Sequence, residues 1–313
     1  MREPPPHVSD DDVLVLLRSS WDRDLASVTH LPVGFGAHHW RADAEGTPRF
    51  FVTLDLPDER KTASELEASY AAAAQLAASG LEFVVPSLPS VTGSFTVPCA
   101  DGDLSVTAWR DGTSHGFGPP ETREAAEATL AMLRRLHATA PPPGLAPWRP
   151  VIDRAFSARL ALRLGTPWDT GPYGERARAA LSRHVEDIGR WSAAYLRLCD
   201  AAVDRPWGAT HGEPHQGNQL VTPTGRVLVD WETARRAPAE RDLRVLVEGG
   251  FADLCGDAID WEMVEMYDLE WRLDEISQYA DWFSAPHDGT KDDEIAYGGL
   301  LGELDRADFA VEA

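Results

Sequence analysis

Apolar positions alternate with polar ones over the first hundred residues, in runs typical of short strands. The segments SVTHLPVGFGAHHWRAD (27–43) and TPRFFVTLDL (47–56) predict strands around a glycine turn. The segment SFTVPCADGDLSVTAW (94–109) predicts a hairpin that closes at Asp101 and Gly102. The first third of the chain is therefore expected to be rich in sheet.

The period changes to that of amphipathic helices in the rest of the chain. Apolar residues recur at helical spacing in 121–140, 175–203 and 261–283. One helix is also predicted within the sheet-rich part: it starts at Ser64, with Glu67 three residues later as a capping box, and stops at Gly80. A small sheet-rich part with one helix is thus followed by a larger helical part.

The stretch THGEPHQGNQLVTPTGRVLVDWE (210–232) concentrates acidic, amide and histidine side chains around a turn. On a helix, His211 and His215 would lie on one face, as a zinc hydrolase site requires. Pro214 and Gly212 disfavour a helix here, so the segment is predicted to be a loop. Zinc therefore remains the weaker interpretation.

The same stretch predicts a hairpin that brings two oxygen ligands together. Short apolar strands at 219–221 and 227–229 fold Asp230 back beside Asn218. Amide and carboxylate oxygens suit Mg²⁺, which combines few protein ligands with phosphate oxygens. Glu213, just upstream, could deprotonate an acceptor hydroxyl. An ordinary polar hairpin is the alternative, but the order acid, Asn, hairpin, Asp is that of a kinase catalytic loop.

These motifs resemble the aminoglycoside phosphotransferase family, and in particular its spectinomycin-phosphotransferase-like branch. The resemblance rests on HGEPHQGN, VLVDWE and ERDL, and RRLHA (134–138) and WRLDEISQYADWF (271–283) extend it over nearly the whole chain. It implies a bilobal, protein-kinase-like α+β fold. A nucleotide-binding lobe would occupy 1–110, with a hinge near 108–111, and a catalytic and acceptor-binding lobe would occupy 111–313.

The resemblance also implies a role for each matching position. It makes Glu213 the base, Asn218 and Asp230 the ligands of Mg²⁺, His211 and Asp242 structural supports, and Trp109 a nucleotide contact at the hinge. Glu232, two residues beyond Asp230, has three possible roles: it supports the metal ligands without binding the metal, it contacts the substrate, or it is simply an exposed acid.

Two positions depart from the family pattern. The catalytic acid is Glu213, one methylene longer than the usual aspartate. Thr53 lies in the strand FFVTLD where kinases place the lysine that holds the ATP phosphates. Lys61, just before the predicted helix, and Arg49, on the same strand face as Thr53, are the candidates to replace that lysine.

The glycine turn PVGFGAHH is the candidate for a loop over the phosphates. Gly34 and Gly36 would let the backbone approach a nucleotide, although the same pattern describes a tight hairpin. A P-loop is excluded, because the chain has no Gly-x-x-x-x-Gly-Lys-Ser/Thr motif.

Charge narrows the expected partners. The chain has 51 acidic and 29 basic residues, a formal net charge of −22, and its only lysines are Lys61 and Lys291. Such a charge repels nucleic acid and anionic lipid and attracts cationic ligands, although an acidic surface also serves solubility. The chain lacks an apolar run long enough to span a membrane and an apolar signal sequence, so a cytoplasmic location is expected. Three widely spaced cysteines are expected to be buried thiols.

Together these features predict an O-phosphotransferase that uses Mg²⁺ and ATP or GTP and acts on a small, cationic acceptor such as an aminoglycoside or aminocyclitol. The alternative is a nucleotide-binding or regulatory pseudokinase, which the threonine at position 53 favours. The acceptor and the oligomeric state are not specified by the sequence.

Overall fold

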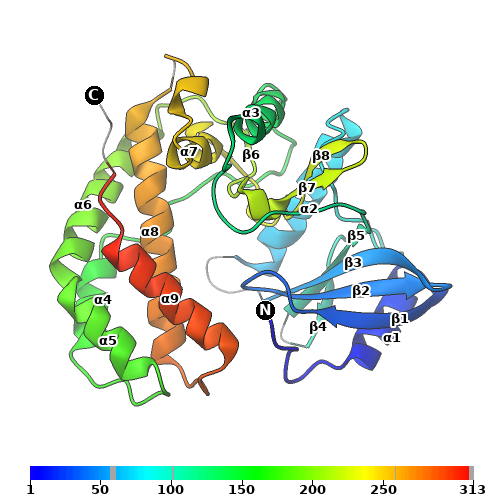
Figure 1. Cartoon of the computed structure of the whole chain (residues 1–313), viewed down its shortest axis with the longest axis horizontal. Helices are drawn as coiled ribbons and strands as arrows, with labels where there is room; N and C mark the ends of the chain where they lie inside the picture. Colours follow the sequence, from blue (N-terminus) through cyan, green and yellow to red (C-terminus); the bar gives the residue numbers. More distant parts are fainter. Residues whose placement is uncertain (57–60, 101, 258, 310–313) are drawn as a thin grey trace. The chain divides into compact units, whose positions relative to one another are not determined.

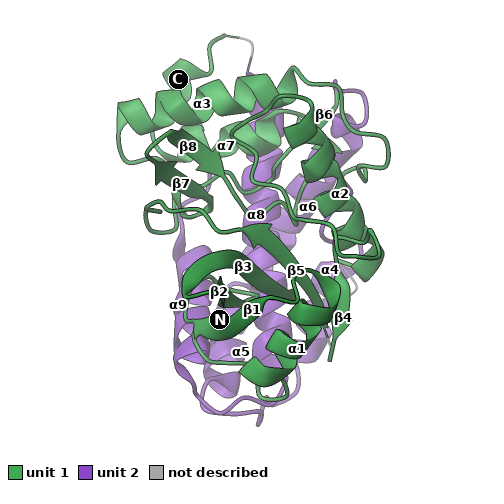
Figure 2. Cartoon of the chain, turned by 90° about the vertical axis from the view of Figure 1, so that its right-hand side faces the viewer, with its two compact units in different colours: residues 1–148, 207–257 green, residues 149–206, 258–313 purple. Residues whose placement is uncertain are grey.

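The structure, a computed structural model, describes residues 1–56, 61–100, 102–257 and 259–309. Its contacts divide the chain into two units, coloured separately in Figure 2. Unit 1 comprises 1–148 and 207–257, and unit 2 comprises 149–206 and 258–313. Unit 1 therefore holds both the predicted sheet and the catalytic-loop stretch, and the boundary between lobes at 110–111 stays a prediction.

Unit 1 carries the strands and the helices that surround them (Figure 1). Its elements are α1 (Asp10–Ser20), β1 (Leu25–Leu31), β2 (His38–Ala44), β3 (Thr47–Asp55), α2 (Ala63–Ala78), β4 (Val97–Cys99), β5 (Gly102–Ala108), α3 (Arg123–His137), β6 (Gly208–Thr210), η1 (Gln216–Asn218), β7 (Gln219–Thr222), β8 (Gly225–Leu228), β9 (Arg235–Ala237), α7 (Glu240–Glu248) and η2 (Ala252–Leu254).

Five strands form an antiparallel sheet in the order β1-β2-β3-β5-β4. This confirms the strands predicted from alternation, including the β4–β5 hairpin, although Asp101 in its turn lies outside the described residues. In β3 the side chains of Phe50, Val52 and Leu54 are buried, whereas Thr53 points to the opposite face. The sheet thus has one face in a core and one face available for polar side chains.

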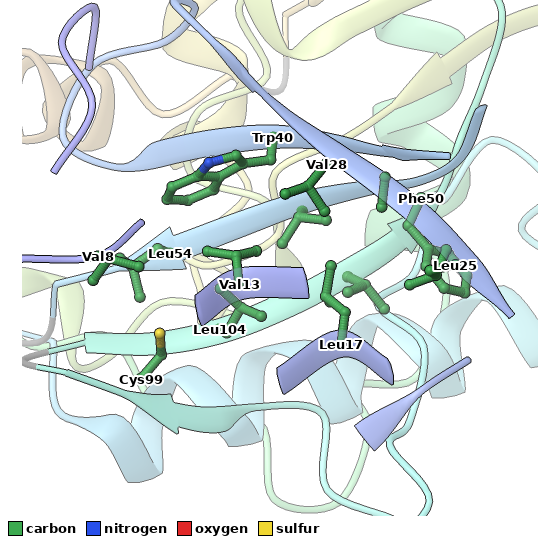
Figure 3. Packing of buried hydrophobic residues seen from close by; sticks show 13 residues of the cluster. Val8, Val13, Leu17, Leu25, Val28, Trp40, Phe50, Leu54, Cys99 and Leu104 are labelled. Atoms are coloured by element: carbon green, nitrogen blue, oxygen red, sulfur yellow. The ribbon is translucent and has the colours of Figure 1, made fainter. Parts of the chain in front are cut away.

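The buried face of the sheet packs against α1, a helix that the sequence analysis did not predict. The Ser9 hydroxyl accepts a hydrogen bond from the backbone N–H of Asp12, and the Asp12 carboxylate accepts one from the backbone N–H of Ser9. This capping box starts the helix. Val13 and Leu17 then enter the core beside strand residues such as Leu104 (Figure 3). Over its described residues, the sheet-rich part therefore contains two helices, α1 and α2, instead of the one expected.

Helix α2 begins with a different capping box from the predicted one. Thr62 is the N-cap, and its hydroxyl accepts from the N–H of Glu65, whose carboxylate accepts from the N–H of Thr62. Glu67 instead accepts hydrogen bonds from the backbone N–H groups of Phe95 and Thr96 at 2.8–3.0 Å. The predicted box at Ser64 and Glu67 is therefore wrong, because a contact distant in sequence takes up the Glu67 carboxylate.

The predicted hairpin is present as β7 and β8, and it packs on α2 and α3. The backbone N–H of Leu228 donates to Phe83 O at 2.7 Å, and that of Val85 donates to Leu228 O at 3.0 Å. Apolar residues of α2, α3 and the hairpin share one buried cluster, which includes Leu76, Leu136 and Leu228. This cluster fixes the strand that leads into Asp230.

Unit 2 is helical over its described residues. Its elements are α4 (Phe156–Leu164), α5 (Gly174–Arg183), α6 (Val185–Ala202), α8 (Trp261–Ser284) and α9 (Lys291–Asp305), with α8 packed against α5, α6 and α9. The helix predicted over 175–203 is divided at His184, which joins α5 to α6. The described helices include none long and apolar enough to cross a membrane. Cys99 and Cys199 are buried as expected, whereas Cys255 is half-buried.

Candidate active site

A buried aspartate of α7 holds the loop between β6 and β7 through hydrogen bonds. Asp242 accepts hydrogen bonds from the backbone N–H groups of His211 (3.0 Å) and Gly212 (2.6 Å) and from His137 Nε2 (2.9 Å). Burial alone would raise the pKa of this carboxyl, but the hydrogen bond and charge of His137, with the other donors, hold the pKa below its ordinary value. Asp242 therefore anchors the loop as a carboxylate.

His211 ties the same loop to the strand that precedes Asp230. Its side chain is fully buried, with Nε2 2.9 Å from Val229 O, and its Nδ1 accepts the N–H of Glu213 at 3.1 Å. These two partners assign the tautomer with the proton on Nε2. Burial lowers the pKa of His211 to about 4, so the ring is neutral at neutral pH.

Gly212 allows this loop to pass close to an arginine of α7. Its φ of +102° lies in the left-handed region, and a Cβ there would lie 2.5 Å from Arg241 Nη1. Arg241 uses that group to donate to Thr210 Oγ1 and Thr233 O. A side chain at this position would therefore be strained by the backbone and would have to displace the Arg241 guanidinium group.

Two hydrogen bonds bring Glu213, Asn218 and Asp230 together. The side-chain amide of Asn218 donates to Glu213 O at 3.0 Å, and the N–H of Val229 donates to Asn218 O at 2.9 Å. Asp230 follows directly, with φ +64°, in the left-handed region that aspartate adopts more readily than most residues. Asp230 is exposed to solvent at the end of the hairpin.

The surroundings of Asp230 are acidic. The protein atoms around it and the charges of Glu232 and Glu213 raise the pKa of Asp230 well above its ordinary value, whereas Lys61 lowers it. A divalent cation would relieve this repulsion, and the Asn218 amide oxygen with the Asp230 carboxylate is a donor set that suits Mg²⁺. Among the described residues no group of three or more His, Cys, Asp or Glu side chains could hold a metal ion. A cation here would need further oxygens from a ligand.

Lys61 lies between two carboxylates of the same unit. Its ammonium group contacts the Glu232 carboxylate and is 3.5 Å from Asp55 Oδ1, and Asp55 Oδ2 accepts a hydrogen bond from the Tyr70 hydroxyl at 2.7 Å. Burial alone would lower the pKa of Lys61, but Glu232, Asp55 and Asp230 raise it above its ordinary value. Lys61 is therefore a cation in an acidic cluster that includes Asp230.

The open face of the sheet presents Thr53 and an aromatic row. Thr53 Oγ1 lies 3.2 Å from His39 Nδ1, and the His39 ring stacks near Phe51 with 5.0 Å between centroids. The next ring is Trp109, 6.5 Å from Phe51, and its backbone N–H bonds to the carbonyl of Arg49. Thr53 and Trp109 thus lie on the same side of β3 and β5, joined by Phe51.

Gly34 and Gly36 both have positive φ, of +72° and +87°, in the loop from β1 to β2. A Cβ on Gly34 would lie 2.8 Å from His39 Nε2, whereas one on Gly36 would meet open space. The loop therefore passes directly over the ring that contacts Thr53.

Arg49, the second candidate for the missing strand lysine, lies away from this cluster. Its guanidinium pairs with Asp22 at 3.2 Å and is 60% exposed. Asp55 lies six residues further along the same strand, roughly 20 Å at the rise of a β-strand. Of the two candidates, the structure brings only Lys61 to the acids around Asp230.

Several residues of this cluster were missed by sequence reasoning. Asp55 contacts Lys61 and Tyr70 only through the folding of β3 against α2, and neither Asp55 nor Tyr70 belongs to a motif. His137 lies within RRLHA, but that motif does not reveal its contact with Asp242. His215 Nε2 lies 3.7 Å from Glu213 Oε2, a pairing that the spacing of HGEPH could have suggested.

The antiparallel sheet, the anchored loop, and Asn218 and Asp230 on either side of a hairpin are the arrangement expected of a kinase-like phosphotransferase. The chain belongs to the phosphotransferase enzyme family, whose model matches residues 27–285. Among curated proteins it is similar to protein StrN of Streptomyces griseus, with 27% identity over 298 residues that cover 90% of this chain and 88% of StrN.

Solved structures show the same fold. The spectinomycin phosphotransferase APH(9)-Ia, in complex with ADP and spectinomycin, matches with a TM-score of 0.73 at 15% identity over 94% of both chains. A choline/ethanolamine kinase family protein from Mesorhizobium loti matches with a TM-score of 0.57 at 21% identity, covering 94% of this chain and 92% of that one. A microcompartment-associated aminopropanol kinase matches with a TM-score of 0.59 at 13% identity over 94% of both chains.

Proposed function

We propose that this phosphotransferase transfers the terminal phosphate of ATP or GTP, with Mg²⁺, to a hydroxyl group of a small cationic molecule such as an aminocyclitol or aminoglycoside. The observation on which this rests is the convergence of Glu213, Asn218 and Asp230 through hydrogen bonds of 2.9 and 3.0 Å. An acid beside two oxygen ligands is the set of groups that phosphoryl transfer requires.

In this mechanism each residue acts on a stated atom. Glu213 accepts the proton of the acceptor hydroxyl. The oxygen of that hydroxyl bonds to the terminal phosphorus while the bond from this phosphorus to the leaving nucleoside diphosphate breaks. Asn218 Oδ1 and the Asp230 carboxylate would hold Mg²⁺, which neutralises phosphate charge when bound. Neutral His211 and ionised Asp242 keep the loop in place without taking part in proton transfer.

The nucleotide would lie against the open face of β3 and β5. The loop at Gly34 and Gly36 would cover its phosphates, Trp109 would contact it at the hinge, and Thr53 would line the site through its contact with His39. Lys61 would supply the phosphate-binding cation, because it is the lysine that reaches the acids around Asp230. Glu232 would act behind the metal ligands by contacting Lys61.

A cationic acceptor is supported by charge and by the similar proteins. The net charge of −22 favours a cation electrostatically. Spectinomycin, choline, ethanolamine and aminopropanol, which appear in the names of proteins with this fold, carry both a hydroxyl group and an amine or quaternary ammonium group. We therefore expect the acceptor to be an amino alcohol in this broad sense.

Thr53 favours a second candidate, a pseudokinase that binds nucleotide without efficient transfer. The two are separated by calorimetric titration of ATP and GTP, with and without Mg²⁺, into the wild type and the Asp230→Asn variant. Asparagine tolerates the positive φ at this position, so the substitution removes charge and leaves the backbone in place. Asp200→Asn, at an exposed acid paired with Arg154, is the matched control.

A phosphotransferase should bind nucleotide with Mg²⁺ and lose most of that affinity in Asp230→Asn only. It should then release ADP or GDP when supplied with an amino alcohol from a panel of aminocyclitols, aminoglycosides, choline and aminopropanol. Nucleotide binding with no turnover on any acceptor would favour the pseudokinase. No nucleotide binding at millimolar concentration would contradict both candidates.

A further inference from the structure

The proposed phosphate-binding lysine needs a partner that holds it, and the usual partner is not available. In kinases a strand lysine pairs with a glutamate of the following helix. Here Glu65 caps the first turn of α2 through Thr62, and Glu67 accepts the backbone N–H groups at 95–96. Both carboxylates of the helix thus accept backbone N–H groups, whereas Lys61 forms ion pairs with Asp55 and Glu232.

From this geometry we infer that Asp55, the last residue of β3, is a positioning residue that holds Lys61 for the phosphates, together with Tyr70 and Glu232. The inference rests on the proposed function and deepens it. Compared with kinases, the lysine lies after the strand instead of within it, and its acidic partner lies in the strand instead of the helix.

Asp55 is held rigidly enough for this role. It is 1% exposed, and it is paired with Asp103 in the ladder between β3 and β5. Gly102 passes so close that a Cβ there would lie 2.3 Å from Asp55 O, so the strand end and the neighbouring strand are in direct contact. Tyr70, a residue of α2 that is 4% exposed, donates its hydroxyl to Asp55 Oδ2 at 2.7 Å. Oδ1 is left to face Lys61 at 3.5 Å.

A structural salt bridge alone explains this arrangement poorly. Asp55 is 1% exposed, and burial together with the charge of Glu232 raises the pKa of its carboxyl group well above the ordinary value, so a partly exposed lysine offsets only part of the cost of burying it. An apolar residue of similar volume at this buried position would avoid that cost. A second carboxylate, Glu232, contacts the same ammonium group from the segment just after Asp230. Lys61 is thus restrained from two sides, beside the proposed metal ligand.

The experiment uses the fact that the protein has only two lysines, Lys61 and Lys291. Lys291 is 60% exposed and pairs with Glu294 three residues along the same helix, so it is an internal reference for amine reactivity. A short pulse of acetic anhydride at pH 8, followed by peptide mass spectrometry, gives the ratio of acetylation at the two lysines. We expect Lys61 to react at least tenfold more slowly than Lys291 in the wild type.

The variants remove one part of the arrangement at a time. Asp55→Ala should raise the Lys61 ratio at least fivefold, and Tyr70→Phe, which deletes only the hydroxyl, should raise it by a smaller factor. Both should weaken ATP·Mg²⁺ binding in calorimetry, by at least tenfold and about threefold, and leave adenosine binding unchanged. Lys61→Met should weaken ATP as Asp55→Ala does, whereas Lys291→Met, the matched control, should not.

The outcomes separate this inference from the function on which it rests. If the wild type binds ATP·Mg²⁺ and Asp55→Ala binds it equally tightly, with unchanged Lys61 reactivity, Asp55 does not position Lys61 although the function stands. If Asp55→Ala increases Lys61 reactivity but no form of the protein binds nucleotide, the proposed function fails and the positioning role fails with it. Should Asp55→Ala lose its thermal transition, the Tyr70→Phe result decides, and wild-type values there would overturn the inference.

Discussion

The buried histidine of the catalytic loop makes the stability of the fold depend on pH in a way that can be calculated. His211 has a pKa of about 4 in the folded protein, against 6.5 in an exposed chain, because it is fully buried. The unfolded protein therefore binds more protons between these values, and the free energy of unfolding rises with pH from about 4 to 6.5. Above pH 6.5 the ring is largely neutral in both states. As the pH falls, protonation of His211 in the unfolded chain lowers the free energy of unfolding.

The magnitude follows from the two pKa values. At pH 5 an unfolded histidine with pKa 6.5 is almost fully protonated, whereas the buried ring with a pKa of about 4 is almost fully neutral. The difference in proton binding lowers the free energy of unfolding by about 2 kcal/mol between pH 7 and pH 5. Carboxylates titrate over part of this range, so the wild-type profile alone cannot isolate one histidine.

The assay is therefore a comparison of variants. Urea unfolding followed by tryptophan fluorescence at pH 5, 6 and 7 is measured for the wild type, His211→Gln and His115→Gln. Glutamine can keep the donor to Val229 O but does not titrate, so the profile of His211→Gln should be flatter by about 2 kcal/mol between pH 7 and pH 5. The exposed His115 should give the wild-type profile. Parallel profiles for the wild type and His211→Gln would refute the claim that His211 folds as a buried neutral ring.

Two further predictions concern other parts of the chain. Gly34→Ala should weaken ATP binding about tenfold in calorimetry, because a side chain there is strained at φ +72° and would lie 2.8 Å from the His39 ring; unchanged affinity would show that the loop does not cover the phosphates. Asp308→Ala should lower the free energy of urea unfolding by about 1–2 kcal/mol, because it removes the carboxylate that pairs with the fully buried Arg272 at 2.9 Å; an unaltered unfolding midpoint would contradict this.

Local patterns were enough to predict the strands and the hairpin after the catalytic loop. The two short strands that place Asp230 beside Asn218 are adjacent in sequence and joined by a tight turn, so their pairing needs no distant information. Helix starts were less certain. The letters TASELE contain both Thr62 with Glu65 and Ser64 with Glu67 at capping-box spacing, and only the contact of Glu67 with residues 95–96 decides between them.

Long-range contacts set the limit of the sequence analysis at the site. Lys61 could be named as a candidate because lysines are so few, but its neighbours could not. The alternation of β3 predicts the face of the sheet on which Asp55 lies, and the apolar pattern of α2 predicts that Tyr70 is buried. The contact between Asp55 and Tyr70 depends on how α2 packs near the end of β3, and the periodicity of neither element predicts that packing.

The glutamate in place of the usual catalytic aspartate can be tested through the geometry of its loop. The backbone of Glu213 is fixed on both sides, since its N–H donates to His211 Nδ1 at 3.1 Å and its carbonyl accepts from Asn218 at 3.0 Å. With the backbone held, Glu213→Asp withdraws the carboxylate by about 1.5 Å, the length of one carbon–carbon bond, from its place 3.7 Å from His215 Nε2. Such a displacement of a base should lower kcat about a hundredfold, with the KM for ATP unchanged. Steady-state kinetics on the acceptor found by screening, with Glu186→Asp at an exposed site as control, would measure this. An aspartate variant as fast as the wild type would mean that the loop does not hold the carboxylate at a fixed distance, and that Glu213 and aspartate are interchangeable on this scaffold.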